Sequence, residues 1–210
     1  MQRNFLPFPP QGLYVITRDP QGERVNLLEE VKSAVRGGAA VVQYRAKEGR
    51  CSVDEARDLL AVCRSASVPL IINDDVNLAL EIGADGVHLG RDDDGLIPAR
   101  EALGSRSIIG VSCYDDLSRA QAAQEAGASY VAFGRFFPSQ TKPNAPCASL
   151  DTLRKAHRDL HIPIVAIGGI TRKNGASLID AGAQLLAVIE GVFGEQCPEI
   201  ATREFRALWD

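Results

Sequence analysis

The chain has 210 residues, of which 45% are hydrophobic and 24% charged, and its formal net charge is −4. We expect residues 1–210 to form a single domain, because this length can bury one full core. The small negative charge and the lack of a basic run argue against nucleic acid or an anionic membrane as the main partner. No apolar run could span a bilayer and no secretion signal is evident, so we expect a cytoplasmic protein.

The cysteines indicate a reducing compartment. Their number is odd and none has the C-x-x-C spacing of a metal or redox site. We expect free thiols, and no catalytic cysteine, because no histidine accompanies them in a recognisable arrangement. The five are Cys51, Cys63, Cys113, Cys147 and Cys197.

Short apolar runs alternate with amphipathic segments along the whole chain. Residues 1–11 carry three prolines and should form an irregular N-terminal arm. We expect strands over the apolar runs, at residues 12–17, 40–43, 70–72, 86–89, 107–111, 129–133, 164–167 and 184–189. We expect helices at residues 25–36, 53–66, 76–82, 96–103, 117–126, 150–160, 173–181 and 198–209.

Local signals support several of these boundaries. Gly37 and Gly38 should end the first helix, since glycine accepts the left-handed backbone of a helix C-terminus. Ser52 should cap the second helix, with Glu55 three residues later completing a capping box.

The alternation of eight strands with eight helices predicts a TIM barrel. Gly-Ala pairs that close a helix and open a strand recur at Gly38, Gly83 and Gly127, about 45 residues apart, a spacing that holds two strand–helix units. Gly182 begins a further pair of this kind. An α/β barrel of strand–helix units is the fold that this repetition favours, and a doubly wound open sheet is the alternative.

Acidic residues follow two neighbouring strands. Asp74 comes after the strand at 70–72, and Asp92, Asp93 and Asp94 come after the strand at 86–89. In a strand–helix–strand unit both strands are parallel, so these carboxylates should meet at one edge. Oxygen ligands without Cys or paired His suit Mg²⁺. Alternatively, Asp74 or Asp75 caps the following helix, and the three later aspartates form a solvated turn.

Cations are expected at the same edge of the barrel. Gln43, Arg45 and Lys47 alternate along an extended segment, so they should lie on one side of it. Other strand ends supply further polar residues, namely Asn73, His88, Arg91, Ser112, Arg135, Ser139, Thr141 and Lys142. Cations beside a Mg²⁺ site suit a pyrophosphate, and active sites of TIM barrels lie at the carboxyl ends of the strands. Solvated loop charges, the alternative interpretation, would not concentrate there.

Gly168 and Gly169 follow the seventh expected strand. TIM barrels often bind a phosphate through backbone N–H groups of the loops after strands seven and eight, and glycine permits close approach. We therefore expect two anion sites, one for a diphosphate with metal and one for a monophosphate.

The chain resembles the thiamine phosphate synthase family over nearly its whole length. The motifs that carry the resemblance are VVQYRAK, LIINDD, GADGVHLGRDD, IIGVSC, YVAFGRFFPSQTK and IVAIGGI, in this order. The resemblance implies a transferase of thiamine biosynthesis. Its reaction joins 4-amino-2-methyl-5-hydroxymethylpyrimidine diphosphate to thiazole phosphate and releases pyrophosphate.

The resemblance also implies roles for individual residues. Asp74 and Asp93 would hold Mg²⁺. The diphosphate would be bound by Arg45, Lys47, Asn73 and Lys142, and the pyrimidine by Gln43 and Ser112. The thiazole phosphate would be received by Ser139, Gln140, Thr141 and Gly169, together with the backbone of Ile189 or Glu190. The candidate catalytic residues are Arg45, Lys47, Ser112 and Lys142.

The implied chemistry needs charge neutralisation on the leaving diphosphate more than a general acid–base pair. We therefore expect His88, a lone histidine on an apolar strand, to be structural or to line the pocket rather than to act as catalyst. A metal site at His157 and His161 is not expected, since the helix near them belongs to the outer ring.

Two positions depart from the commoner family pattern. Glu190 stands where many members have a serine beside the thiazole phosphate, so we expect its side chain to point away from the phosphate. Ala46 replaces a glutamate between Arg45 and Lys47, and by alternation it should face the other side. Two alternatives to the synthase are a thiazole tautomerase, which needs no diphosphate and metal site, and a non-catalytic phosphate-binding barrel.

Overall fold

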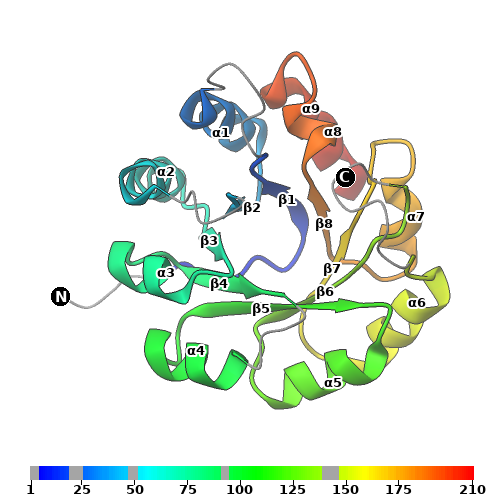
Figure 1. Ribbon diagram of the computed structural model, residues 1–210. Helices are drawn as coiled ribbons and strands as arrows, with labels where there is room; N and C mark the ends of the chain where they lie inside the picture. The colour runs from blue at the N-terminus through cyan, green and yellow to red at the C-terminus, as the bar shows by residue number, and fades with distance from the viewer. Residues whose placement is uncertain (1–4, 19–25, 47–51, 91–94, 139–146) are drawn as a thin grey trace.

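Eight parallel strands form a closed barrel in the order of the sequence (Figure 1). A computed structural model describes residues 5–18, 26–46, 52–90, 95–138 and 147–210. The predicted TIM barrel is confirmed, and the alternative of an open doubly wound sheet is wrong. The strands are β1 Gly12–Ile16, β2 Val41–Tyr44, β3 Leu70–Asn73, β4 Gly86–Leu89, β5 Ile108–Tyr114, β6 Tyr130–Gly134, β7 Ile164–Ile167 and β8 Leu185–Val188.

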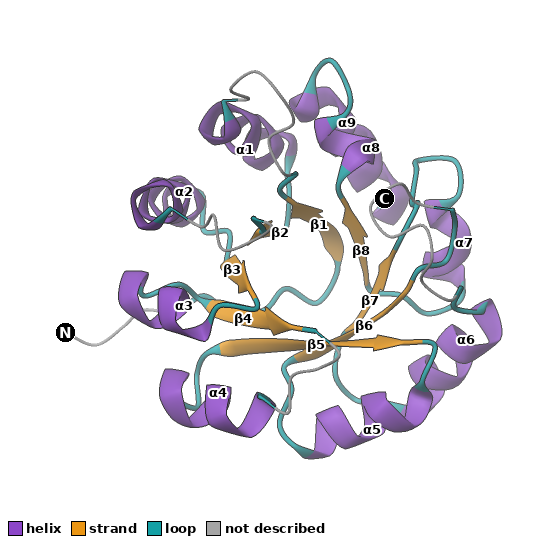
Figure 2. Ribbon diagram, in the orientation of Figure 1, coloured by secondary structure: helices purple, strands orange, loops and turns teal. Residues whose placement is uncertain are grey.

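Helices surround the strands as an outer ring (Figure 2). They are α1 Leu27–Gly37, α2 Val53–Ser65, α3 Val76–Ile82, α4 Leu96–Leu103, α5 Leu117–Glu125, α6 Leu150–Asp159, α7 Gly175–Asp180, α8 Glu190–Phe193 and α9 Pro198–Arg206, followed by a 3₁₀ turn, Ala207–Trp209. The short helix α8 was not expected, because four residues are too few to show a periodic pattern. Within the described ranges, the helices are too short or too polar to serve as membrane spans.

One difference from the expected boundaries is in β5. This strand continues to Tyr114, beyond the expected end at Val111, and its pairing with β6 shifts register between Ser112 and Tyr114. The extension was missed because the polar Ser112 interrupts the apolar run. It carries Ser112 to the carboxyl end of the barrel in extended backbone.

Strand side chains alternate between two apolar layers. Leu13 and Val15 belong to the large cluster between the strands and the helices, whereas Tyr14 and Ile16 belong to a smaller cluster inside the barrel. Each fully buried aliphatic side chain of this kind contributes about 1.5–3 kcal/mol to stability. Ala46 packs against the outer cluster, so it faces away from the barrel interior, as expected.

The N-terminal arm closes the amino end of the barrel. Residues 5–11 contain neither helix nor strand, as predicted. The ring of Phe8 packs against the interior cluster and stacks on Tyr130, with ring centroids 4.3 Å apart. The buried carboxylate of Asp85 accepts hydrogen bonds from the Leu6 N–H at 3.1 Å and the Leu70 N–H at 2.9 Å. The arm is therefore held against the barrel both by the packing of Phe8 and by the hydrogen bond from Leu6 to the buried Asp85 carboxylate.

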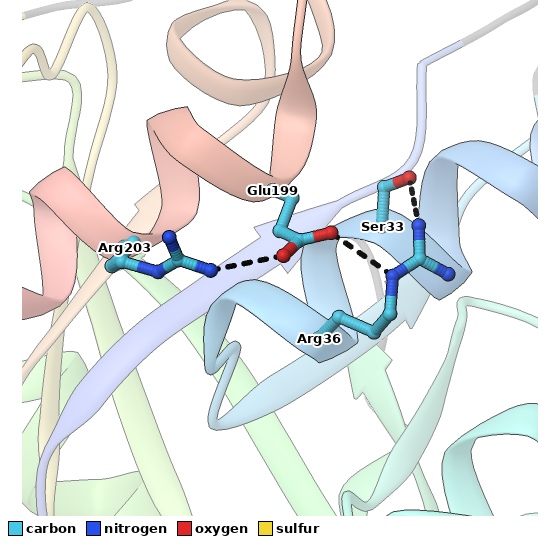
Figure 3. Close-up of polar contacts among 4 residues, drawn as sticks. All are labelled: Ser33, Arg36, Glu199 and Arg203. Atoms are coloured by element: carbon cyan, nitrogen blue, oxygen red, sulfur yellow. Dashed lines mark hydrogen bonds and ion pairs between the residues drawn. The ribbon is translucent and has the colours of Figure 1, made fainter.

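Helices α1 and α9, from the two ends of the chain, pack together and complete the outer ring. Figure 3 shows Glu199 of α9 between two arginines, with Oε2 3.0 Å from the Arg36 Nε and Oε1 2.9 Å from an Arg203 nitrogen. Arg36 also donates to the Ser33 hydroxyl at 2.9 Å. Exposed ion pairs like these contribute about 0–1 kcal/mol, so packing rather than charge holds the two helices together.

Two helix caps differ from or refine the expectation. The Ser52 hydroxyl accepts from the Glu55 N–H, but the Ser52 N–H donates to the Tyr44 hydroxyl, which in turn donates to Glu55. The predicted capping box is therefore wrong in its second half, because Tyr44 takes the place of the direct contact. Asp75 caps α3 through the Leu78 N–H at 2.8 Å.

Candidate active site

A cavity of about 500 Å³ opens at the carboxyl ends of the strands. Side chains from every side of the barrel line it, including Tyr14, Gln43, Arg45, Asn73, His88, Ser112, Tyr130 and Arg135. The loops after β7 and β8 complete the wall with residues 168–171 and 189–191. Cavities of this size hold small organic ligands, and this end of a TIM barrel is where its active site lies.

The predicted site residues that the structure describes converge on this cavity, apart from Asp74. Those that line it are Gln43, Arg45, Asn73, Ser112, Gly169, Ile189 and Glu190. Asp74 lies next to the lining residue Asn73. Six predicted site residues lie outside the described residues: Lys47, Asp93, Ser139, Gln140, Thr141 and Lys142.

Asp74 has an unusual backbone conformation at the end of β3. Its φ is +60°, and its N–H donates to the His88 carbonyl at 2.8 Å. The Asn73 amide donates to the Asp74 carboxylate at 2.7 Å. Since Asp75 is the residue that caps α3, Asp74 is not needed for that purpose, and its carboxylate stays exposed at the strand end. The Asp74 carboxylate thus provides oxygen atoms, which are the ligands that a hard cation prefers.

No group of three or more His, Cys, Asp or Glu side chains in the described part of the chain could hold a metal ion. The second predicted metal ligand, Asp93, falls outside that part. The described residues therefore provide one candidate ligand, Asp74.

Thr17 fixes the backbone of Arg45 at the cavity. The Thr17 hydroxyl, on a fully buried residue, accepts from the Arg45 N–H at 2.9 Å and donates to the Arg45 carbonyl at 3.1 Å. The Thr17 N–H also donates to the Gln43 carbonyl at 2.9 Å. Because Gln43 of β2 and Arg45 just after it are both held by this threonine, which follows β1, the guanidinium of Arg45 starts from a defined backbone position.

The floor of the cavity is a chain of hydrogen-bonded side chains. The Gln43 Nε2 donates to the Tyr14 hydroxyl at 2.9 Å, and that hydroxyl is 2.8 Å from the Tyr130 hydroxyl. The Tyr130 hydroxyl is 2.9 Å from His88 Nδ1, and His88 Nε2 is 2.9 Å from the Ser112 Oγ. Burial raises the pKa of both Tyr14 and Tyr130, so both phenols stay protonated at neutral pH. His88 lines the cavity, as expected.

The loop after β7 passes close to the loop after β6. Gly168 and Gly169 have φ values of +104° and +65°, and a Cβ on Gly169 would lie 2.3 Å from the Pro138 carbonyl oxygen. Only glycine fits this approach, and it leaves bare backbone on the cavity wall, which an anion can contact.

Glu190 begins the short helix α8 at the cavity mouth and is exposed. One carboxylate oxygen lies 2.9 Å from the place that a Cβ on Gly194 would occupy, so the side chain runs along α8 toward its C-terminal end. Glu190 and Gly194 both line the cavity, so the expectation that the carboxylate points away from a bound phosphate stays a prediction. Ile189 lies beside it, against the interior cluster.

Sequence reasoning missed three residues of the site: Tyr14, Thr17 and Tyr130. Each belongs to or follows a strand whose two faces are both apolar. The hydrophobic pattern of such a strand does not show which side chains point into the barrel. A usable signal was the alternation along β1, in which Tyr14 stands two residues before Ile16 on the inward face.

Other candidate residues do not take part in this site. The His161 N–H donates to Gln124 beyond the end of α6. Cys63 and Cys113 are buried free thiols, and burial raises the pKa of each to about 12. Cys147 and Cys197 are exposed free thiols, and Cys51 falls outside the described residues.

The fold and the cavity together define a TIM barrel with a pocket for a small molecule at the carboxyl ends of its strands. The sequence profile of a family described as thiamine monophosphate synthase matches residues 13–192. The chain therefore belongs to this family, and the predicted family and enzyme class, a transferase, are confirmed.

Similar proteins span nearly the same length as this chain. A protein of Methylococcus capsulatus named thiamine-phosphate synthase is 52% identical over 208 residues, covering 98% of this chain and 92% of the relative. A protein of Nitrosococcus oceani with the same name is 50% identical over 198 residues, covering 93% and 91%. Both alignments therefore extend over nearly the whole of this chain.

Among solved structures, a thiamine phosphate pyrophosphorylase from Pyrococcus furiosus is similar with a TM-score of 0.83 and 33% identity, covering 95% of each chain. A 3-hexulose-6-phosphate synthase is similar with a TM-score of 0.65 and 18% identity, covering 93% of this chain and 98% of the other. The latter likeness shows the fold alone.

Proposed function

We propose that this protein is a thiamine-phosphate synthase that joins 4-amino-2-methyl-5-hydroxymethylpyrimidine diphosphate to thiazole phosphate. The observation that carries the proposal is the convergence of Gln43, Arg45, Asn73 and Ser112 with the bare backbone of Gly168–Gly169 on one cavity. Family membership supplies the reaction, and the cavity supplies a polar floor, a cationic side and a backbone wall for its two substrates.

The diphosphate belongs at the edge formed by β2 and β3. Arg45 presents a planar guanidinium that can pair with two phosphate oxygens, and the Asn73 amide can donate to a third. Asp74, with its exposed carboxylate, and Asp93 would hold Mg²⁺ there, and Lys47 and Lys142 would add cations. Bound Mg²⁺ would neutralise charge on the leaving diphosphate.

The pyrimidine ring belongs on the cavity floor, between Gln43 and Ser112. The thiazole phosphate belongs at the opposite wall, against the backbone of Gly169 and of Ile189 and Glu190, with Ser139, Gln140 and Thr141 as further contacts. A cavity of about 500 Å³ is large enough for both rings, and transfer requires the thiazole nitrogen to lie next to the exocyclic carbon of the pyrimidine.

The reaction follows as a substitution at the exocyclic carbon of the pyrimidine. The carbon–oxygen bond breaks and its electron pair leaves with the diphosphate, while the ring stabilises the resulting cation. The thiazole nitrogen then donates its electron pair to that carbon. Arg45 stabilises the negative charge that grows on the leaving group, and no residue needs to remove a proton.

The test is product formation by the purified protein from the two phosphorylated precursors, with Mg²⁺ and with Mg²⁺ removed by a chelator. We expect thiamine phosphate and pyrophosphate in equal amounts, and only with Mg²⁺. Absence of product despite binding of thiazole phosphate would favour a tautomerase or a non-catalytic barrel instead.

The metal assignment has its own test in a pair of variants. Asp93→Ala should raise the Mg²⁺ concentration needed for half-maximal rate by about tenfold or more, because a ligand is lost. The matched control is Asp75→Ala, which removes a neighbouring carboxylate that caps α3 and should cost about 1 kcal/mol of stability. An unchanged Mg²⁺ requirement in Asp93→Ala would refute the assignment.

A further inference from the structure

The cavity floor contains three residues whose hydroxyl or imidazole groups lie between Gln43 and Ser112. Tyr14, Tyr130 and His88 connect these two residues through contacts of 2.8–2.9 Å. Each phenol has one proton to donate, and a neutral imidazole has one N–H. The direction of one hydrogen bond in such a chain therefore determines the direction of the next.

The direction starts at Gln43. Its Nε2 donates to the Tyr14 oxygen, so the Tyr14 proton must find another acceptor. Both tyrosines are fully buried, and among the described residues the Tyr130 oxygen is the acceptor within reach. The Tyr14 hydroxyl therefore donates to Tyr130, since an unpaired buried donor is costly.

The same argument continues through Tyr130. Its own proton cannot point back along the contact that Tyr14 already fills, so it points to His88 Nδ1. An Nδ1 that accepts leaves the ring proton on Nε2, which then donates to the Ser112 Oγ. The remaining proton of Ser112 is directed to the cavity that this residue lines.

The packing around Tyr130 holds this arrangement in place. Phe8 of the N-terminal arm stacks flat under the ring, with an interplanar angle of 5°. On β5, a Cβ added to Gly110 would lie 1.9 Å from the Tyr130 Cζ, so the phenol crosses the strand where no side chain could stand. Tyr130 therefore has no room to turn away from Tyr14 and His88.

At the Gln43 end of this series of hydrogen-bonded side chains, the amide oxygen of Gln43 is open to the cavity. Gln43 lines the cavity, and its side-chain oxygen is not among the buried unpaired atoms of the described residues. With one Nε2 hydrogen donated to Tyr14, the amide is fixed with its oxygen toward the cavity, and this oxygen, which can only accept, is the atom that Gln43 offers a ligand.

We infer that Tyr14, Tyr130 and His88 are positioning residues that make Gln43 an acceptor and Ser112 a donor, so that together they select an amino-substituted nitrogen heterocycle. The ring's amino group donates to Gln43, and a ring nitrogen accepts from Ser112. The ring that the synthase reaction requires has this pattern, so the inference about the ligand depends on the proposed function. A 4-oxo ring, with an acceptor in place of the amino donor, is disfavoured.

The first experiment determines which nitrogen of His88 carries the proton, and hence the direction of the hydrogen bonds, and it needs no ligand. Nitrogen chemical shifts of His88 in the ¹⁵N-labelled protein distinguish an Nε2–H ring from an Nδ1–H or doubly protonated ring. We expect the neutral Nε2–H form in the wild type and a shift toward Nδ1–H in Tyr130→Phe, because Nδ1 loses its donor. An Nδ1–H or charged ring in the wild type would overturn the direction of the chain.

The second experiment measures selectivity by calorimetry, with the 4-amino pyrimidine diphosphate and its 4-oxo analogue. The wild type should bind the amino ring about a hundredfold more tightly, since the oxo ring leaves an acceptor facing an acceptor. In Tyr130→Phe the Tyr14 proton loses its acceptor and can turn to the Gln43 oxygen. The amide then presents its NH₂ to the cavity, and the selectivity should fall about tenfold or more.

The matched control is Tyr44→Phe. It also removes a buried phenol hydroxyl from a barrel strand, but one that contacts Glu55 and Ser52 on the outward face. Tyr44→Phe should keep the wild-type selectivity ratio. Tyr14→Phe provides a second break in the chain should Tyr130→Phe fold poorly. Unchanged selectivity in both chain variants would overturn the inference. Failure of the wild type to bind either ring would instead overturn the proposed function, and the His88 signal would still decide the direction of the chain.

Discussion

Buried polar groups at the two ends of the barrel differ in how completely they are hydrogen-bonded within the protein. At the amino end, Asp85 is fully buried and both its oxygens accept backbone N–H groups, from Leu6 and Leu70. At the carboxyl end, the Gln43 amide donates to Tyr14 but keeps its oxygen toward the cavity. A fully paired group stabilises the fold, whereas a group with bonding capacity left over is available to a ligand.

The largest effect should come from the carboxyl end. Arg45→Ala should lower kcat/KM about a thousandfold, equivalent to about 4 kcal/mol, because the charge on the leaving diphosphate loses its planar partner. Its thermal stability should stay near wild type, since the side chain lies at the open cavity. Steady-state pyrophosphate release measures the effect.

A suitable control for Arg45→Ala is Arg57→Ala. Arg57 is an exposed arginine on the outer face of α2, where it pairs with Asp54 and Glu81. We expect wild-type kcat/KM for this variant. Equal losses in both variants would show that Arg45 acts through general charge rather than through the site.

Asp85→Ala should show the opposite behaviour at the amino end. The change leaves the N–H groups of Leu6 and Leu70 without their acceptor, so the free energy of unfolding should fall by about 3 kcal/mol. Urea unfolding measures this loss. At a temperature where the variant is folded, KM for both substrates should equal the wild-type value. A large rise in KM with intact stability would contradict the division between the two ends.

Thr17→Val tests a residue that belongs to both categories, since it is fully paired yet supports a cavity residue. Loss of its hydroxyl removes both contacts to the Arg45 backbone, so KM for the pyrimidine diphosphate should rise about tenfold with a smaller change in kcat. Thr17→Ser keeps the hydroxyl and should restore the wild-type KM.

The matched control is Thr202→Val in α9. Thr202 is equally buried, but its hydroxyl has no hydrogen-bond partner among the residues that the structure describes, so the change removes no hydrogen bond seen there. We expect wild-type KM and equal or higher stability. A tenfold rise in KM in this control as well would show that the effect of Thr17→Val does not come from its contacts to Arg45.

The smallest effect should be at the outer ring. Glu199→Gln removes the charge between Arg36 and Arg203, and we expect a loss of less than about 0.5 kcal/mol, because all three side chains are at least partly exposed. Thermal unfolding at low and at high salt measures it. A loss above about 1 kcal/mol at low salt would show that the ion pairs, and not only packing, join α1 to α9.

The sequence was sufficient for the fold and for part of the site. The recurring apolar runs and Gly-Ala pairs predicted a barrel, and the rule that active sites lie at strand ends predicted Gln43, Arg45, Asn73 and Ser112 at one cavity, where the structure places them. Chain order alone carried this inference, because parallel strands in a barrel must present their ends together.

The floor of the cavity could not be predicted in this way. Tyr14 and Tyr130 lie in apolar runs and read as core residues, and their bond joins positions 116 residues apart. In a barrel both faces of a strand are buried, so hydrophobicity does not show which side chains point inward. The role of Tyr44 in replacing the capping box at Ser52 was hidden for the same reason.

By itself, then, the sequence determined which elements form, their order, and which polar residues stand at the strand ends, because these depend on local propensity and on the spacing of apolar runs. Only the tertiary structure decided which strand residues face inward, that Thr17 holds Arg45, and that five side chains connect across the floor from Gln43 to Ser112. Those contacts depend on the register between strands, which closure of the barrel imposes and no local pattern encodes.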